Sequence, residues 1–578
     1  MLEYQAPQRD FEFLLFELFE VENHWQDIPA FAEFGDDLAK AVLAEGGRLA
    51  AEVMAPVNQS GDEEGCRWED GAVTTPAGFK SAYQELAQGG WLGLSGNPEF
   101  EGQGMPKMLG CLLEEMFWAA NTSLYLYGTL SVGTAICIDA HGSAEQRALY
   151  LPKLYSGQWS GAMGLTEPHA GTDLGIIRTK AEPVADGGYR ITGTKIFITS
   201  GEHDLAENIV HLVLAKVPGA PAGSKGISLF IVPKFLPKAD GSPGERNTFA
   251  SGSIEHKMGI RGSATSVMNF DGAVGYLVGE ENQGLPGMFT MMNYERLSVG
   301  LQGLGAGELA YQQAARYARD RLQGRSPLGP QNPEGLADSL LVHPDVRRML
   351  LTIRTLTEAG RAFAVFVGLQ LDRAKYLGDA DAQALSELLT PIAKAFLSDR
   401  GFECAVLAQQ VFGGHGYIRE WGVEQIVRDA RIAQIYEGTN GVQAQDLIGR
   451  KVLRDGGAVL GSLLDKVDVQ QVPETFRDDL AAAVQQLRAV TNSVVQRCAE
   501  DPALAGSIAT DYLDLVGYTL YAWIWARVAG VAPADEFGAG KQTCAAFYFG
   551  RILPRTAALT QSINAESAVV MDLPEELF

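Results

Sequence analysis

Two short segments of the sequence combine residue types and spacings that could do chemistry. The first, residues 164–173, reads Gly-Leu-Thr-Glu-Pro-His-Ala-Gly-Thr-Asp. Its small residues allow a ligand to approach closely, and its hydroxyls and backbone N–H groups could hydrogen-bond the edge of a flat heteroaromatic ring. A turn capped by Thr172 and Asp173 is the alternative interpretation of the same residues.

The second segment, residues 434–443, carries a carboxylate at a bend. Glu437 follows Ile435 and Tyr436 and precedes a Gly-Thr-Asn-Gly turn, so its side chain could project into an apolar cavity. Loss of hydration there would raise the pKa of the carboxyl and strengthen it as a base. A surface glutamate at a helix end is the alternative interpretation.

Other common reaction centres are not indicated. The eight histidines never form HExxH, no GxSxG occurs, and the six cysteines include no CxxC pair, so neither a metal site nor a serine hydrolase is expected. Residues 303–307 read Gly-Leu-Gly-Ala-Gly, which has the wrong spacing for a dinucleotide fingerprint and lies in a helical pattern. These glycines predict close helix–helix packing.

Charge and hydropathy exclude two classes of partner. The chain has 578 residues and a formal net charge of −25, so it should repel nucleic acid and anionic lipid. The most apolar run, residues 515–526, is too short to cross a bilayer, and residues 1–10 do not resemble a signal peptide. We expect a cytoplasmic protein that binds no nucleic acid and has no integral membrane segment.

The periodicity of the apolar residues positions these segments in an α+β multidomain chain. Residues 159–276 alternate with a period of two, which predicts an antiparallel sheet, whereas the flanking segments have helical periodicity. The predicted parts are an arm (1–35), an N-terminal helical domain (36–158), a middle β domain (159–276), a C-terminal helical bundle (277–455) and an additional helical domain (456–578).

Together with three further stretches, these segments resemble the acyl-CoA dehydrogenase family over roughly residues 37–454. The stretches are Lys-Ile-Phe-Ile-Thr-Ser-Gly from residue 195, Lys-Met-Gly-Ile-Arg-Gly-Ser from 257, and Tyr-Glu-Arg-Leu from 294 with Arg321 about 25 residues later. Gln-Val-Phe-Gly-Gly-His-Gly-Tyr from residue 410 agrees as well. The resemblance implies the acyl-CoA dehydrogenase fold, helix–sheet–helix, with FAD bound noncovalently between the sheet, the C-terminal helices and a neighbouring subunit.

The family also implies roles for individual residues. Glu437 matches the catalytic base, which takes an α-proton of the thioester while its own backbone N–H holds the carbonyl oxygen and FAD accepts the β-hydride. The remaining positions implied by the resemblance are Leu165, Thr166, Phe197 and Thr199 at the flavin ring, Gly171 and Thr172 near the flavin or CoA, Arg321, Gln410 and Gly414 at the partner subunit's FAD, Thr439 at its own FAD, and Thr172, Glu295, Arg296, Tyr436 and Gly438 at the substrate.

Three positions qualify the resemblance. Ile176 and Gln425 stand where the family motifs usually have a small residue and a Lys or Arg. Both positions lie away from the chemistry, so they bear on the subgroup more than on the activity. Glu295 lies where some relatives place their base on another helix, and we favour Glu437 because those relatives generally lack Glu in the later motif.

The resemblance implies a FAD-dependent oxidoreductase of fatty acid β-oxidation that forms a trans-2-enoyl-CoA. The subgroup resembled, enlarged bacterial enzymes, includes fatty acyl-CoA and 3-methylmercaptopropionyl-CoA dehydrogenases; we favour a fatty acyl-CoA substrate. Electron-transferring flavoprotein is the expected acceptor. An acyl-CoA oxidase that uses oxygen and a non-catalytic acyl-CoA-binding scaffold are the alternatives.

The additional C-terminal domain bears on the assembly. Its apolar residues, including Leu515, Tyr518, Tyr521 and Trp525, must pack against something. Family members without such an extension usually pair dimers into tetramers through their C-terminal helices. We therefore expect this domain, together with the aromatic arm at residues 11–19, to cover that surface and leave a homodimer.

Overall fold

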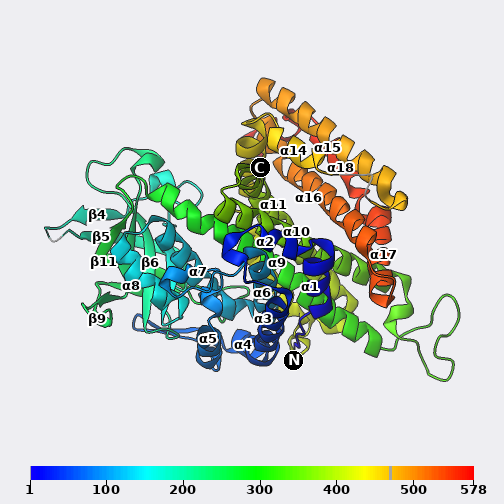
Figure 1. Cartoon of the computed structure of the whole chain (residues 1–578), viewed down its shortest axis with the longest axis horizontal. Helices are drawn as coiled ribbons and strands as arrows, with labels where there is room; N and C mark the ends of the chain where they lie inside the picture. Colours follow the sequence, from blue (N-terminus) through cyan, green and yellow to red (C-terminus); the bar gives the residue numbers. More distant parts are fainter. Residues whose placement is uncertain (1, 186, 468–471) are drawn as a thin grey trace. The chain divides into compact units, whose positions relative to one another are not determined.

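Helices and strands follow the predicted order of helices, sheet and helices (Figure 1), and the predicted fold class is confirmed. The computed structural model describes residues 2–185, 187–467 and 472–578. Its contacts form two compact units, which we describe separately: residues 1–5, 46–105 and 120–298, and residues 6–45, 106–119 and 299–578. This grouping differs from the five parts predicted from the sequence, whose boundaries stay a prediction.

A seven-stranded sheet dominates the first unit, with strands in the order β3, β6, β7, β11, β5, β4 and with β10 beside β11. The pairs are antiparallel as predicted, except that β3 and β6 run parallel. A parallel pair requires a long connection, and here that connection contains β4 and β5. The strands are β3 (Trp159–Gly164), β4 (Lys180–Pro183), β5 (Tyr189–Thr199), β6 (Asn208–Ala215), β7 (Ser228–Pro233), β10 (Phe249–Ile254) and β11 (Thr265–Val278).

The sequences of β5 and β6 explain which of their residues are buried. β6 is apolar on both faces and buried along its whole length, whereas β5 alternates between buried residues and residues that face outward. β11 pairs with β5 and β10 in its first part and with β7 over its last three residues. The register of β11 against β5 shifts at two places, between Ser266 and Met268 and between Asp271 and Ala273.

Two helices of the first unit, α7 and α8, begin at side-chain caps. Asn121 accepts a hydrogen bond from the Leu124 N–H (3.0 Å) at the start of α7, and Ser143 and Gln146 form a capping box at the start of α8. The remaining strands form two small hairpins. The elements are α4 (Asn58–Glu64), α5 (Phe79–Gln88), α7 (Thr122–His141), α8 (Ala144–Tyr155), β1 (Arg67–Glu69) with β2 (Ala72–Thr74), and β8 (Phe235–Pro237) with β9 (Pro243–Arg246).

Long helices form the second unit. Gly378, with a left-handed φ of +62°, ends α10, and Asp379 caps α11 by accepting a hydrogen bond from the Ala382 N–H (3.0 Å). The helices are α10 (Pro344–Leu377), α11 (Ala380–Val411), α12 (Val423–Arg431), α13 (Asn440–Gln445), α14 (Ala458–Asp465), α15 (Glu474–Glu500), α16 (Leu504–Val531), α17 (Glu536–Phe547), α18 (Arg555–Ile563) and α19 (Ala568–Met571). Three more helices, α3 (Asp36–Leu49), α6 (Lys107–Ala120) and α9 (Gly284–Asp320), contribute residues to both units.

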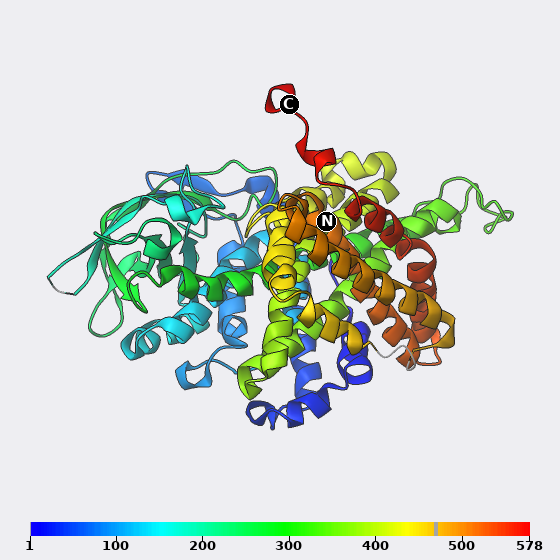
Figure 2. The ribbon, with the colours of Figure 1, turned by 90° about the horizontal axis from the view of Figure 1, so that it is seen from above.

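Helix α16 is the centre of the C-terminal domain. It is apolar nearly all round, and it packs on α10, α11 and α13 as well as on α15, α17 and α18 (Figure 2). Tyr518, Tyr521 and Trp525 are buried, and the Trp525 indole donates a hydrogen bond to the Thr355 carbonyl on α10 (3.2 Å). These apolar residues of the domain therefore pack against the preceding helices of this unit, while the expected homodimer stays a prediction.

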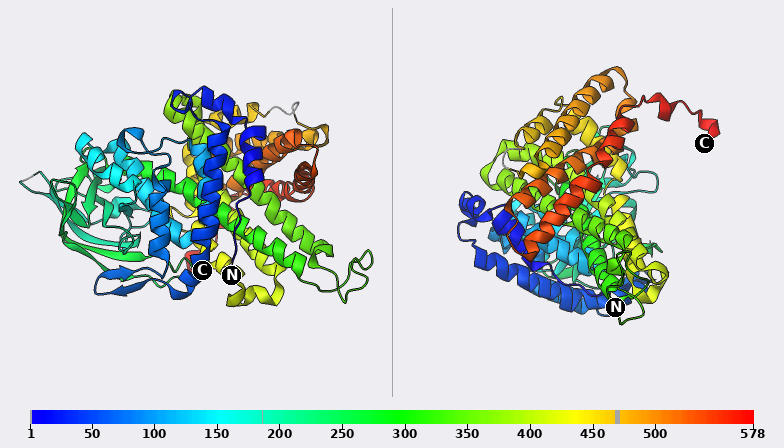
Figure 3. Two further views of the ribbon diagram at one scale, coloured as in Figure 1. Left: turned by 60° about the horizontal axis from the view of Figure 1, so that its bottom comes forward. Right: turned by 90° about the vertical axis from the view of Figure 1, so that its right-hand side faces the viewer.

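The N-terminal arm packs on the same helices (Figure 3). Its first helices are α1 (Gln8–Glu12) and α2 (Val21–Gln26). The Phe13 ring meets Phe537 edge to face at 5.4 Å, and the Arg527 guanidinium lies 5.2 Å from the Phe19 ring centroid. The aromatic residues of the arm therefore cover part of the C-terminal domain.

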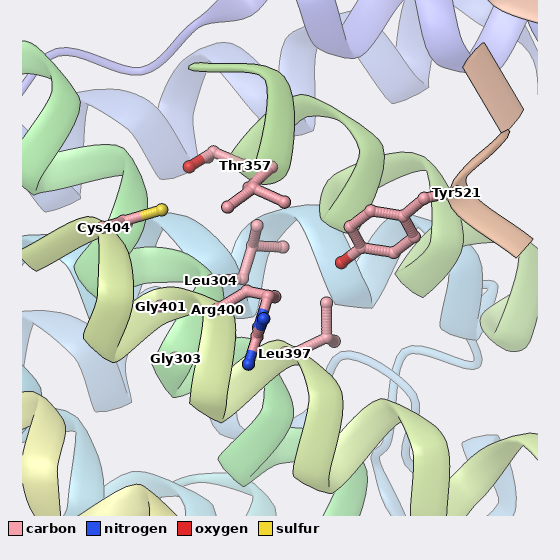
Figure 4. A pocket seen from close by; sticks show the side chains of 10 residues that line it. Gly303, Leu304, Thr357, Leu397, Arg400, Gly401, Cys404 and Tyr521 are labelled. Atoms are coloured by element: carbon pink, nitrogen blue, oxygen red, sulfur yellow. The ribbon is translucent and has the colours of Figure 1, made fainter. Parts of the chain in front are cut away.

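The glycines at residues 303–307 serve helix packing, as predicted. A Cβ on Gly303 would lie 2.5 Å from the Cα of Ser398, and one on Gly401 would lie 2.0 Å from the Gly303 carbonyl oxygen. Beside this contact lies a small cavity among α9, α10, α11 and α16, lined in part by Thr357, Arg400 and Tyr521 (Figure 4). None of the predicted site residues lines this cavity.

A buried cluster of charges ties the arm and the C-terminal domain to the bundle. Arg361 on α10 donates to Glu115 on α6 (2.5 Å), to Glu308 on α9 (2.6 Å) and to Asp10 in the arm. Lys541 on α17 donates to the same Asp10 and, at 2.8 Å, to Glu358. Burial raises the pKa of Glu115 to about 7 although Arg361 opposes this.

None of the described helices combines the length and the apolar character needed to cross a bilayer. The cytoplasmic location stays a prediction.

We predict that Arg361→Met destabilises the protein by about 3–5 kcal/mol, because it leaves buried carboxylates without their counter-ion. Arg348→Met is the matched control on the same helix, since Arg348 pairs with Asp345 at an exposed position (2.9 Å) and should contribute under about 1 kcal/mol. Thermal unfolding of both variants measures the difference, and equal melting temperatures would contradict a stabilising role for the cluster.

Candidate active site

The carboxylate at residue 437 sits on a left-handed turn between a short 3-10 helix (Ile432–Gln434) and α13. Glu437 has a φ of +57° and Gly438 a φ of +78°. A non-glycine residue in this region costs about 1–3 kcal/mol, and such strain concentrates at functional sites. Thr439 then caps α13 by accepting a hydrogen bond from the Val442 N–H (3.3 Å).

Buried polar side chains hold this turn in place. The Gln443 amide donates to the Glu437 carbonyl (3.0 Å), and the Lys394 ammonium on α11 donates to the Gly438 carbonyl and the Asn440 side chain (2.8 Å each). Lys394 and Gln443 are fully buried. The strained backbone is therefore fixed by two buried donors, one on α11 and one on α13.

The side chains around Glu437 are less enclosed than its backbone. Glu437 and Tyr436 are half-buried, and Ile435 is 46% exposed. The Tyr436 hydroxyl donates to the Gln302 side chain on α9, which fixes the orientation of the Tyr436 ring. The apolar cavity expected around Glu437 stays a prediction.

In the first unit, the structure brings two of the predicted segments together at the end of β3. The Ile196 N–H donates to the Thr166 carbonyl (2.9 Å), so the loop that carries Leu165 and Thr166 lies against the end of β5. That end carries Thr199 and Phe197, whose ring is 59% exposed and whose backbone is left-handed with a φ of +58°. The structure thus brings together the two segments that carry the four residues predicted at the flavin ring. Phe197 is exposed, Thr166 and Thr199 are half-buried, and Leu165 is buried.

The outer part of the same loop contains a capped turn. The Asp173 carboxylate accepts a hydrogen bond from the Gly175 N–H (2.9 Å), as the alternative interpretation of this segment expected. Gly171 and Thr172 are exposed, and a Cβ on Gly171 would meet open space. The turn and a binding role are thus compatible, because they use different residues of the loop.

An ion pair that joins the two segments was not assigned a role from the sequence. Lys195 on β5 donates to the Glu167 carboxylate and to the Leu165 carbonyl (2.9 Å each). Glu167 also accepts hydrogen bonds from the N–H and hydroxyl of Thr179 (3.0 and 2.6 Å) and from the Arg178 N–H (2.7 Å). Burial lowers the pKa of Lys195 to about 8, while Glu167 opposes that shift. Burial alone would raise the pKa of Glu167, but Lys195 and these hydrogen bonds hold it below its usual value.

The second candidate base, Glu295, is also in the first unit and is buried. Gly133 on α7 leaves space for the Glu295 carboxylate, because a Cβ added to this glycine would lie only 2.7 Å from one of the carboxylate oxygens. Arg296 beside it is buried and donates to the Asn293 side chain (3.4 Å).

The segments that carry three residues predicted to contact the partner subunit's FAD lie side by side in the second unit. Arg321, Gln410 and Gly414 are all exposed. Tyr317, one helical turn before Arg321, stacks on Phe412 with ring centroids 4.1 Å apart and shares a hydrogen bond with His415 (2.9 Å), so the end of α9 lies beside residues 410–415. That Tyr317 packs on this segment was not predicted from the sequence. The only signal in the sequence is a set of aromatic residues near the glycine pair at residues 413–414.

Family models match most of the chain. The acyl-CoA dehydrogenase N-terminal domain matches residues 39–158, the middle domain residues 162–273, the C-terminal domain residues 282–453, and an acetyl-CoA dehydrogenase C-terminal-like domain residues 463–574. The last match covers the additional helical domain.

Curated relatives are similar over the full length. The 3-methylmercaptopropionyl-CoA dehydrogenase of Ruegeria pomeroyi is 44% identical over 92% of this chain and 92% of its own. The broad-specificity linear acyl-CoA dehydrogenase of Mycobacterium tuberculosis is 33% identical over 100% of both chains. A solved structure whose title concerns the electron transferring flavoprotein of Acidaminococcus fermentans is 27% identical, with a TM-score of 0.61, over 73% of this chain and 100% of that one.

Proposed function

This chain belongs to the acyl-CoA dehydrogenase family, and from that premise we propose that Glu437 is the catalytic base of its reaction. As a member it is an FAD-dependent oxidoreductase that acts on the CH–CH bond of acyl-CoA thioesters. The family, the reaction class and the cofactor predicted from the sequence are thereby confirmed. The roles of individual residues belong to the proposal.

The proposed cofactor residues suit FAD chemically. The exposed Phe197 ring can lie against a flat isoalloxazine, and the Thr166 N–H and hydroxyl can donate to its polar edge. The exposed Arg321 guanidinium offers a planar fork of donors that suits a pyrophosphate of the partner subunit's FAD. The remaining proposed contacts are Leu165, Gly171, Thr172, Thr199, Gln410, Gly414 and Thr439.

Glu437 takes the α-proton of the bound thioester, which leaves the β-hydrogen to depart as hydride. Bound FAD supplies the hydride acceptor, and the product is a trans-2-enoyl-CoA. The backbone N–H of Glu437 holds the thioester carbonyl oxygen and stabilises the charge that develops there. The left-handed turn supports this role most directly, because it sets the direction in which the side chain and the N–H of one residue leave the backbone. Thr172, Glu295, Arg296, Tyr436 and Gly438 complete the proposed substrate site.

We predict that Glu437→Gln binds FAD and acyl-CoA normally but reduces its flavin at least about 100-fold more slowly, because the amide keeps the shape and cannot accept the proton. Anaerobic rapid mixing with acyl-CoA measures this rate from the loss of flavin absorbance. Glu295→Gln is the comparison variant: as a change in the substrate site it can raise KM, but its rate of flavin reduction at saturating acyl-CoA should stay within a few-fold of the wild type. The reverse pattern would move the base to Glu295.

We propose a short linear acyl-CoA as the substrate, of the size of 3-methylmercaptopropionyl-CoA. Full-length similarity to a 3-methylmercaptopropionyl-CoA dehydrogenase and to a linear acyl-CoA dehydrogenase supports this choice. The sulfur of that acyl group stands in for one methylene of pentanoyl-CoA, so both should enter the same site. Electron-transferring flavoprotein is the proposed acceptor, with support from the similar structure whose title names such a protein.

We predict that kcat/KM for 3-methylmercaptopropionyl-CoA and pentanoyl-CoA exceeds that for hexadecanoyl-CoA by about tenfold or more. The reason is that each methylene for which the acyl site has no room costs about 1–3 kcal/mol of transition-state binding. The assay uses electron-transferring flavoprotein as the acceptor. A preference for the long chain would contradict the proposed substrate, and hydrogen peroxide formed at the same rate would identify an oxidase. A protein that stays colourless with FAD would favour the non-catalytic scaffold.

The proposed assembly is a homodimer. The C-terminal domain buries Tyr518, Tyr521 and Trp525 against the bundle, so the covered helix faces are not available to a second dimer. The exposed apolar side chains that remain near Arg321 include Leu322, Tyr417 and Trp421. This surface suits the partner subunit whose FAD the site residues are proposed to reach.

We predict that light scattering on the intact protein gives the mass of two chains, and that removing residues 456–578 makes it associate or precipitate, because the apolar surface under α16 becomes exposed. A mass near four chains, or a truncated form that stays a soluble and active dimer, would contradict this assembly.

A further inference from the structure

The Leu165–Thr166 peptide has an unusual environment, because a buried cation holds one side of it. The Lys195 ammonium donates to the Leu165 carbonyl oxygen (2.9 Å) and is fully buried. The second acceptor of that ammonium is Glu167 (2.9 Å), whose carboxylate is fixed by the backbone N–H groups of Arg178 and Thr179. The position of the cation is thus set by the strand and the loop together.

The direction of the Leu165 carbonyl determines the direction of the next N–H. No peptide bond among the described residues is cis, and in a trans peptide the C=O and N–H groups point to opposite sides. Since the Leu165 carbonyl points toward the buried Lys195, the Thr166 N–H points away from it. Among the residues that the structure describes, this N–H has no hydrogen-bond acceptor.

Some of its neighbours in the loop are paired, whereas no acceptor is found for the N–H groups of His169, Gly171 and Thr172 among the described residues. The Thr166 carbonyl accepts from the Ile196 N–H (2.9 Å), and Glu167 and Ala170 exchange two backbone hydrogen bonds (3.0 Å each). The exposed side chains of His169 and Thr172 lie in the outer loop, whereas Thr166 is half-buried and its own peptide follows the carbonyl that Lys195 holds. The residue that pairs with Thr166, Ile196, directly precedes the exposed Phe197. An acceptor from a ligand would satisfy the Thr166 N–H.

We propose that Lys195 is a positioning residue for the flavin: through the Leu165 carbonyl it aims the Thr166 N–H at the pyrimidine edge of FAD and strengthens it as a donor. The inference rests on the proposed placement of FAD at Leu165, Thr166, Phe197 and Thr199. A cation bonded to the carbonyl of a peptide polarises its N–H, so the two hydrogen bonds reinforce each other. That edge of FAD gains negative charge on reduction, and a stronger donor there favours the reduced form.

Two features of the site maintain the charge on Lys195 at neutral pH. Burial lowers the pKa of its ammonium only to about 8, because Glu167 favours the charged form. The carboxylate is itself held ionised by Lys195 and three hydrogen bonds. Glu167 and Thr179 therefore act on the flavin only indirectly, through the charge and the position of Lys195.

The test is the reduction potential of bound FAD, measured by dye-coupled redox titration of the holoprotein. Lys195→Met should bind FAD and lower the reduced-to-oxidised ratio about tenfold at a given potential, which is about 30 mV for a two-electron couple. Thr179→Val is the matched control, since it removes a hydrogen bond from the same carboxylate (2.6 Å) and leaves the ammonium in place. Because Glu167 keeps its other two hydrogen bonds and Lys195 its charge, the potential of this variant should shift much less than that of Lys195→Met.

A second variant keeps the test decisive if Lys195→Met does not fold. Lys195→Gln retains a donor for the Leu165 carbonyl but carries no charge, and it should shift the potential in the same direction by a smaller amount. An unchanged potential in the variant that folds, or an equal shift in Thr179→Val, would overturn the role of Lys195 while leaving the proposed function intact. A wild-type protein that binds no FAD would instead overturn the proposed function.

Discussion

The left-handed backbone at Glu437 is the constraint on which the proposed site depends. A base for a weakly acidic proton must be held at one position, and a carboxylate on a relaxed helix end would be free to turn into water. Here the left-handed turn fixes the backbone that carries the carboxylate, at a cost of about 1–3 kcal/mol. Lys394 and Gln443 offset that cost, because each donates to a carbonyl group of the turn from a fully buried position.

The two segments predicted at the flavin ring are built on a similar principle. Phe197 also has a left-handed backbone, and a buried lysine, Lys195, donates to a carbonyl of the loop beside it. In both places the cation is on a regular element, β5 or α11, and the residue it supports is on a loop. Rigid elements thus set the geometry of loops that are themselves irregular. Buried charge has a different role around Arg361, where it joins the arm, the bundle and the C-terminal domain.

Sequence patterns predicted much of this organisation. The change of period at residue 159 identified the sheet, and the segments around Thr166 and Glu437 identified the family, because their residue types are dictated by local chemistry. The parallel pairing of β3 with β6 could not be predicted in the same way, since it depends on which strands meet after a long connection. The apolar periodicity also gave no reason to expect that Arg361 and Lys541 would share Asp10.

The supporting residues of the site were the hardest to foresee. Lys394 appears in the sequence as a single charge in an apolar helical run, and only the fold shows that it reaches the Gly438 carbonyl. The left-handed φ of Glu437 could not be predicted from the sequence either, although the glycine that follows it indicates a turn. A buried lysine in an otherwise apolar helix is the one signal that could have prompted a search for its partner.

The central claim is that Glu437 takes the α-proton, and α-proton exchange tests it without the oxidation step. Acetyl-CoA has α-hydrogens but no β-carbon, so it can exchange with solvent and cannot be dehydrogenated. In deuterated water, mass spectrometry should show deuterium entering its methyl group with wild-type protein and with Glu295→Gln, and at least about 100-fold more slowly with Glu437→Gln. Wild-type exchange in Glu437→Gln would contradict the account.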